Sequence, residues 1–140
     1  MPDPVTGPAY LFVYGTLRAG FDGPMARWLR SAARLLGPAT IGGRLYRVAD
    51  YPGLVPGPVG LVQGDLYALT DVTAILARLD EYEEIAAHHP LPHEYRRDLS
   101  VVQTTDGPVT AWIYAYAHDA KGLEPIVGGD FLACARPADG

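Results

Sequence analysis

The stretch from Tyr10 to Gly20 most constrains how this chain can fold. It begins with five large apolar residues, Tyr-Leu-Phe-Val-Tyr, a run too short for a helix and typical of a strand buried on both faces. Gly15 ends the run and Gly20 follows, so we expect a sharp turn in which Gly15 adopts a backbone conformation that is costly for other residues. Backbone N–H groups in such a loop need a side chain, water or ligand oxygen as partner. The alternative is an ordinary strand exit with those donors bonded inside the protein.

Several classes of ligand and partner are disfavoured by the residue types. Gly15 and Gly20 have the spacing of a phosphate-binding P-loop, but Phe21-Asp22 stands where Lys followed by Ser or Thr is required. The formal net charge of −5, with no basic cluster, argues against nucleic acid and anionic membranes as partners. No apolar run approaches the length of a membrane-spanning helix.

The composition predicts one globular domain spanning residues 1–140. Its content of 49% hydrophobic and 19% charged residues suits a single core, and 16 glycines with 13 prolines favour a turn-rich fold over a helical bundle. Residues 1–9 are predicted to be a loose lead-in and 124–140 a tail. Cys134 is the single cysteine, and the amino terminus lacks a signal-peptide pattern, so we expect a cytoplasmic protein.

The apolar patterns predict an α+β fold, a small barrel in which strands outnumber helices about five to two. A first helix begins at Pro24, and its apolar residues recur as far as Leu36. Gly60 and Gly64 inside a strand pattern indicate a bulge or bend, as at a barrel corner. Asp106-Gly107 predicts a hairpin turn. Strands are expected over 10–14, 40–48, 59–69, 95–104 and 109–117, with a short extended piece over 54–58.

A second predicted helix, from Thr70 to Glu84, places one carboxyl group toward the core. Thr70 is the expected N-cap. At about 100° per residue, Glu83 falls roughly 20° from Val72 on the helical wheel, within the apolar stripe. Burial and the negative helix end both disfavour its charge, so we expect a raised pKa. The alternative is that the helix frays before Glu83 and the side chain reaches water or Arg96 and Arg97.

Five short motifs occur in a fixed order along the chain, and together they resemble the γ-glutamylcyclotransferase superfamily. This group includes the AIG2-like proteins and the γ-glutamylamine cyclotransferases. The resemblance extends from Tyr10 to about Ala117 and implies a small mixed β-barrel with flanking helices. The motifs are Tyr14-Gly15-Thr16-Leu17-Arg18, Tyr51-Pro52-Gly53, Gly64-Asp65-Leu66-Tyr67, Leu79-Asp80-Glu81-Tyr82-Glu83 and Tyr95-Arg96-Arg97.

The resemblance also implies an activity and a set of site residues. The implied enzyme releases 5-oxoproline from a γ-glutamyl amine or amide by intramolecular cyclisation, with no metal, nucleotide or other cofactor. Its partner is a small γ-glutamyl substrate, and the group attached to the glutamyl unit stays open. Glu83 is the implied catalytic residue. The implied substrate-binding residues are Tyr14, Gly15, Thr16, Leu17, Tyr51 and Tyr95.

The sequence departs from the family pattern at one end of the second helix. Many relatives have Gly directly after the catalytic glutamate, where this chain has Glu84. The stretch 84–94, rich in His and Pro, is also long for the simplest members. Both departures border the expected cleft, so they affect the expected substrate more than the expected fold.

Two other candidate sites are weaker, and one other function stays open for the same cleft. His88, His89 and His93 invite a metal site, but Pro90 and Pro92 rule out a regular helix there, which leaves a site in a loop or a solvated loop as the alternatives. Cys134 has no evident neighbouring base that would make it a nucleophile, and His118 is expected at the surface. A non-catalytic module that binds an amino-acid-like or peptide-end ligand in the same cleft stays open, because a fold does not fix a function.

Overall fold

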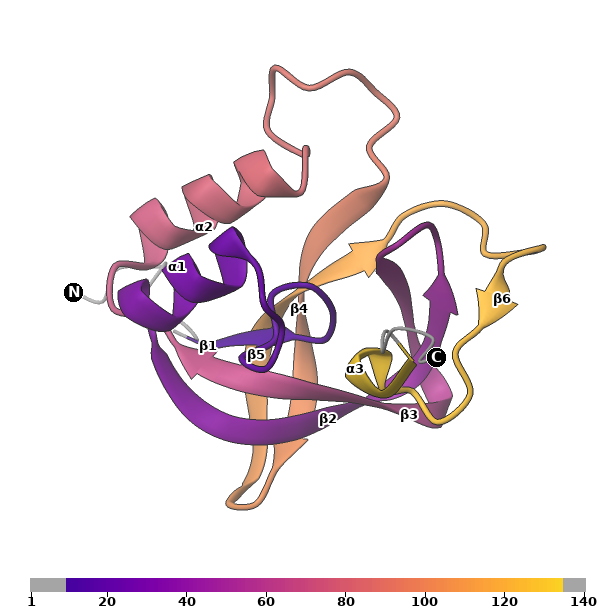
Figure 1. Ribbon diagram of the computed structural model, residues 1–140, viewed down its shortest axis with the longest axis horizontal. Coiled ribbons are helices and arrows are strands. Elements are labelled where there is room, and N and C mark those ends of the chain that lie inside the picture. Colours follow the sequence, from indigo (N-terminus) through magenta and orange to yellow (C-terminus); the bar gives the residue numbers. More distant parts are fainter. Residues whose placement is uncertain (1–9, 135–140) are drawn as a thin grey trace.

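The computed structural model describes residues 10–134, and its central feature is a closed barrel of five strands (Figure 1). The strands are β1 (Tyr10–Val13), β2 (Arg34–Arg47), β3 (Pro52–Ala68), β4 (Tyr95–Thr104) and β5 (Gly107–Tyr116). Their order is β3-β1-β5-β4-β2, and β3 pairs back with β2 to close the ring. β1 and β5 run parallel, whereas the other pairs are antiparallel. The α+β barrel predicted from the sequence is confirmed.

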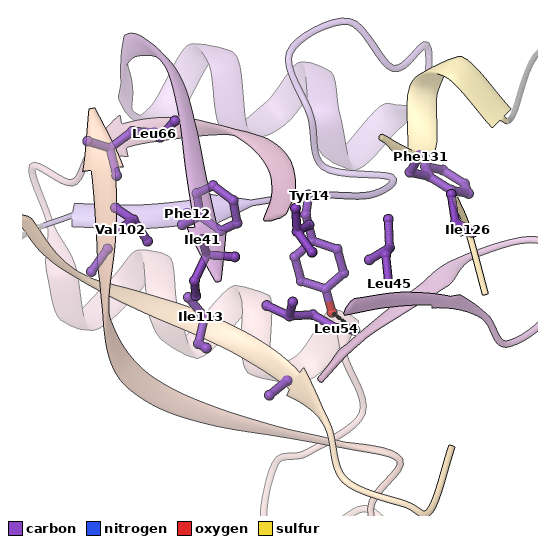
Figure 2. Close-up of a cluster of buried hydrophobic side chains, with 14 residues drawn as sticks. Phe12, Tyr14, Ile41, Leu45, Leu54, Leu66, Val102, Ile113, Ile126 and Phe131 are labelled. Atoms are coloured by element: carbon purple, nitrogen blue, oxygen red, sulfur yellow. Dashed lines mark hydrogen bonds between the residues drawn. The ribbon is translucent and has the colours of Figure 1, made fainter. Parts of the chain in front are cut away.

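Alternation along the strands divides the core into two layers. In β5, Ala111, Ile113 and Ala115 point into the barrel, where Phe12, Ile41 and other apolar side chains fill the interior (Figure 2). Tyr114 lies in the outer layer, beneath the helices α1 (Pro24–Ala32) and α2 (Val72–Tyr82). The two helices cover one side of the barrel in Figure 1.

The first helix is shorter than its apolar pattern predicts. α1 begins at Pro24, as expected, but ends at Ala32. Leu36 was expected on its apolar stripe and instead lies in β2, where it is exposed. The chain leaves the helix early because residues 34–35 and 37–42 pair with β3, with Leu36 at a bulge between them, and this pairing outweighs local helical spacing.

The predicted extended piece and the following strand are one element, β3, interrupted by a bulge. Gly42 pairs with Leu61 and Gly43 pairs with Pro56, so residues 57–60 have no partner on β2. Gly60 has a φ of 95°, and a Cβ there would lie 2.4 Å from the carbonyl oxygen of Gly43. The bend expected from the interior glycines is therefore present, and it changes the direction of one continuous strand.

The end caps and the carboxyl-terminal part also differ from expectation. Asp71, not Thr70, caps α2: its side chain accepts a hydrogen bond from the Ala74 N–H at 3.1 Å. The expected tail contains two elements too short to predict, β6 (Glu124–Pro125) on β2 and α3 (Phe131–Cys134). Residues 1–9 and 135–140 and the side chain of Cys134 lie outside the described part of the chain. No helix within residues 10–134 has the length and apolar character needed to cross a membrane.

Candidate active site

A cavity of about 750 Å³ lies where the loop after β1 meets the end of α2. All seven predicted site residues line it: Tyr14, Gly15, Thr16, Leu17, Tyr51, Glu83 and Tyr95. These residues come from four separate segments of the chain. The barrel therefore gathers the ordered motifs around one space of a size suited to a small ligand.

Gly15 is required by close packing and not by an unusual backbone angle. The expectation of a costly conformation is wrong, because its φ lies outside the left-handed region. A Cβ at Gly15 would instead lie 2.7 Å from Cγ of Pro52, and a proline ring cannot rotate away. The glycine thus lets the loop after β1 pack against the Tyr51-Pro52 segment.

The loop also carries backbone donors that have no partner among the described residues. Within residues 10–134, no hydrogen bond is recorded from the N–H groups of Gly15, Thr16 and Leu17, although all three residues line the cavity. The Thr16 hydroxyl bonds to the Tyr82 hydroxyl at 2.9 Å, which links the loop to the last turn of α2. Unpaired amides beside a cavity are suited to binding an anionic oxygen.

Tyr14 lines the cavity, and its hydroxyl group forms hydrogen bonds within the protein. The hydroxyl donates to the carbonyl oxygen of Tyr114 at 2.5 Å and accepts from the Leu54 N–H at 3.2 Å, the bond dashed in Figure 2. Burial raises the pKa of Tyr14 far above its ordinary value, and the nearby Glu83 raises it further. This phenol therefore stays protonated, and its proton stays in the hydrogen bond to the Tyr114 carbonyl oxygen.

Tyr51 and Tyr95 likewise donate their hydroxyl protons to protein acceptors. Tyr95 donates to the carbonyl oxygen of Pro52 at 2.6 Å, and burial raises its pKa. Tyr51 donates to Oε1 of Glu94 at 2.7 Å, and this bond, followed by burial, raises the pKa of Tyr51 to about 12. Both oxygens keep a lone pair with which to accept from a ligand.

A Schellman motif fixes the backbone at Glu83. The N–H of Glu84 donates to the carbonyl oxygen of Glu81 at 3.1 Å, and that of Ile85 donates to the carbonyl oxygen of Asp80 at 2.9 Å. Glu84 has a φ of 59°, the left-handed position where helices usually place Gly. The departure from the family pattern therefore falls on a position that a glycine would occupy with less strain. The motif ends the helix with Glu83 held at the cavity.

The carboxyl group of Glu83 has the electrostatics of a proton-transfer group. Burial, then the charges of Asp80 and Glu94, raise its pKa from 4.5 to about 7. The salt bridge to Arg97 that the fraying alternative allowed belongs to Asp80, at 3.1 Å, and Tyr114 also donates to Asp80 at 2.7 Å. No ion pair or hydrogen bond to the Glu83 side chain is recorded within the described chain.

The histidine-rich segment forms a cluster beside the cavity, though not from the three histidines considered in the sequence. Glu81, His88 and His89 bring a carboxylate oxygen and two ring nitrogens within 4.8 Å of one another, whereas His93 lies elsewhere on the cavity wall. His89 Nδ1 accepts from the Ala86 N–H at 3.1 Å, so a neutral His89 ring carries its proton on Nε2, facing Glu81 at 3.3 Å. In that tautomer Nε2 carries the proton and has no lone pair for a metal.

Several cavity residues were not found from the sequence. Asp50, Glu94 and His118 line the space, and His118 is exposed, as expected. Asp50 and Glu94 directly precede Tyr51 and Tyr95, so their position beside the motif tyrosines was the available signal. Four carboxyl groups line the cavity, and no Lys or Arg is among the described residues that do so. The donors that this lining offers to an anionic part of a ligand are therefore backbone N–H groups, hydroxyl groups and histidine rings.

Comparisons with known proteins agree on one family. The family described as "Gamma-glutamyl cyclotransferase, AIG2-like" matches residues 11–133. The gamma-glutamylcyclotransferase family protein YtfP of Escherichia coli (strain K12) is 37% identical over 123 residues, which are 87% of this chain and 95% of that protein. The solution structure of E. coli YtfP superposes with a TM-score of 0.60 at 36% identity, covering 88% of this chain and 96% of that one.

Two more distant structures share the fold. An AIG2-like protein of Mus musculus superposes with a TM-score of 0.69 at 24% identity, over 89% of this chain and 88% of that one. YkqA of Bacillus subtilis superposes with a TM-score of 0.65 at 23% identity, over 88% of this chain but 39% of that longer protein. At this level of identity the likeness concerns the architecture alone.

Proposed function

Because this chain belongs to the AIG2-like gamma-glutamyl cyclotransferase family, we propose that it releases 5-oxoproline from a γ-glutamyl amine or amide by intramolecular cyclisation. One observation carries the proposal. Glu83, a carboxyl group with a pKa raised to about 7, shares a cavity of about 750 Å³ with the unpaired backbone donors of Gly15, Thr16 and Leu17. A proton-transfer group and an oxygen-binding loop are what this cyclisation requires.

The loop is proposed to hold the glutamyl end of the substrate. The N–H groups of Gly15–Leu17 have no partner among the described residues, so they are free to donate to the α-carboxylate or to the oxyanion that forms on the γ-carbonyl oxygen. The rings of Tyr14 and Tyr95 would enclose the folded-back chain. Holding that conformer converts the attack into a positioned intramolecular step, which supplies much of the acceleration.

Glu83 is proposed to move two protons in sequence. Its carboxylate first takes a proton from the α-ammonium group, and the freed amine attacks the γ-carbonyl carbon to form the C–N bond of the five-membered ring. Collapse of the tetrahedral intermediate breaks the bond to the departing nitrogen. The carboxyl group of Glu83 gives its proton to that nitrogen as this bond breaks. The regenerated carboxylate then takes the second proton from the ring nitrogen, which leaves the neutral lactam N–H, and passes it to the released amine or to water. A pKa of about 7 keeps both forms populated near neutral pH.

The experiment is incubation with γ-glutamyl compounds that differ only in the departing amine, with 5-oxoproline followed by mass spectrometry. The panel includes amines ending in an ammonium, a methyl or a carboxylate group of matched length. We expect 5-oxoproline from at least one compound with wild type and almost none with Glu83→Gln. Tight binding of these compounds without any 5-oxoproline would instead support the non-catalytic binding module and refute the proposed reaction.

A further inference from the structure

Arg18 secures the loop that carries the unpaired donors, although it does not line the cavity itself. Its side chain is 12% exposed and lies between two carboxylates from distant parts of the sequence. Nε contacts Oδ2 of Asp65 at 3.2 Å, and Nη1 contacts Oδ1 of Asp130 at 2.8 Å. A guanidinium group can make both contacts at once because its donors have a fixed planar arrangement.

Asp65 attaches the loop to the barrel wall at two points. It lies in β3 opposite Val13, the last residue of β1, so it is next to the start of the loop. Besides Arg18, its Oδ2 accepts the backbone N–H of Ala19 at 2.9 Å. Its side chain is 13% exposed. The loop between Val13 and Ala19 is thereby anchored at both ends by one residue of β3.

Asp130 belongs to a carboxyl-terminal strap, residues 126–132, which lies against the same loop. The strap is attached to the barrel by hydrogen bonds to β2 and β3, including one from the Gln63 N–H to the carbonyl oxygen of Gly129 at 2.7 Å. Phe131 is buried and stacks on Phe21, a cavity residue, with ring centroids 6.3 Å apart. The strap therefore packs behind the cavity wall.

We propose that Arg18 is a positioning residue that holds the backbone donors of Gly15–Leu17 in their binding geometry, and that Asp130 makes the strap part of the construction of the site. This inference rests on the proposed function. A partly buried ion-pair network contributes little net stability, because desolvation offsets much of the attraction. Its main effect here is to select one loop conformation, and small displacements of positioning groups are costly to catalysis.

The test compares Arg18→Gln, Arg18→Lys and Asp130→Asn with the control Asp22→Asn. Asp22 is in the next turn and forms an ion pair with Arg27 at 2.6 Å, but its side chain is 95% exposed and does not contact the loop donors. The measurements are kcat, KM and their pH dependence on a panel substrate, together with amide hydrogen exchange. The informative amides are those of Arg18, Ala19 and Phe21, which are hydrogen-bonded in the loop.

Positioning predicts a specific pattern of results. Arg18→Gln should lower kcat/KM on the order of 10²-fold, with KM raised and the pH profile governed by Glu83 kept. Arg18→Lys keeps the charge but not the planar arrangement of donors, so its kcat/KM should lie between those of wild type and Arg18→Gln. Asp130→Asn should lower kcat/KM on the order of tenfold. Each of these variants should speed exchange at Ala19, whereas Asp22→Asn should match wild type in every measurement.

Other outcomes overturn the inference. If Arg18→Gln and Asp130→Asn lower Tm but keep wild-type kcat/KM and loop exchange, the network has a structural role only. If Arg18→Gln does not fold, Asp130→Asn still tests the positioning role. Asp130 is at the surface and partly exposed, so this variant is expected to fold. If wild type releases no 5-oxoproline from any compound, the proposed function fails, while unchanged exchange in the variants would separately refute the positioning role.

Discussion

Replacing Glu83 by Gln tests whether this carboxyl group is kept for proton transfer at a cost in stability. Gln has the shape of the protonated carboxyl group and carries no charge. The pKa of Glu83 is raised from 4.5 to about 7 on folding, so the folded state binds this proton more tightly than the unfolded state. Wild type therefore loses stability as pH rises from 4.5 to about 7, and the Gln variant lacks this loss.

The expected difference follows from the size of the shift. At about 1.36 kcal/mol per pKa unit, a rise from 4.5 to about 7 corresponds to at most about 3–4 kcal/mol above neutral pH. Because the side chain keeps some access to water at the cavity, we expect about 1–3 kcal/mol. Melting curves should therefore show Glu83→Gln several degrees above wild type at about pH 8 and almost equal to it at about pH 4.

Activity should change in the opposite direction to stability. Loss of the proton-transfer group should lower the rate of 5-oxoproline release on the order of 10²-fold or more. Glu81→Gln is the matched control, since Glu81 is 57% exposed and does not line the cavity, and it should have a small effect on both measurements. A variant of Glu83 that melts lower at about pH 8 and keeps near wild-type turnover would refute the reasoning and indicate a structural ion pair.

Four further outcomes are expected. Gly15→Ala should lower stability by about 1–3 kcal/mol and reduce activity, because its Cβ would overlap the Pro52 ring; a tolerated alanine, by Tm and turnover, would contradict this packing. Glu84→Gly should raise Tm by a few degrees by relieving the φ of 59°, and a fall in Tm would argue against strain there. Turnover should survive exhaustive chelation, since the proposed steps use one carboxyl group and backbone donors; activity restored only by zinc would point to the Glu81, His88 and His89 cluster. Departing amines that end in a carboxylate should be processed worst, measured as kcat/KM across the matched panel, because four carboxyl groups line the cavity.

The sequence by itself determined the local elements and the direction of one carboxyl group. Helical spacing placed Glu83 on the apolar stripe of the predicted helix, and in the structure Glu83 lines the cavity as the C-cap of α2. Asp106-Gly107 predicted the hairpin between β4 and β5, which is present. These features are readable because each depends on residues close together in the chain, whose spacing directly sets the face of a helix or strand.

Tertiary structure decided what the local patterns left open or misjudged. Leu36 fits the helical pattern of α1 but lies in β2, because pairing with β3 outweighs local propensity. The sequence predicts a costly backbone conformation at Gly15. In the structure a glycine is needed there because a Cβ would overlap Pro52, a residue of β3. Neither result follows from the residues next to it in the sequence.

The anchoring of the binding loop depends most fully on the tertiary structure. Arg18 contacts Asp65 across 47 positions of the sequence and Asp130 across 112. The barrel closes only when β3 pairs with both β1 and β2, and this closure carries the three side chains to one place. Local spacing encodes which face a residue occupies, whereas the partner opposite that face is set by strand register and barrel closure, which involve the whole chain.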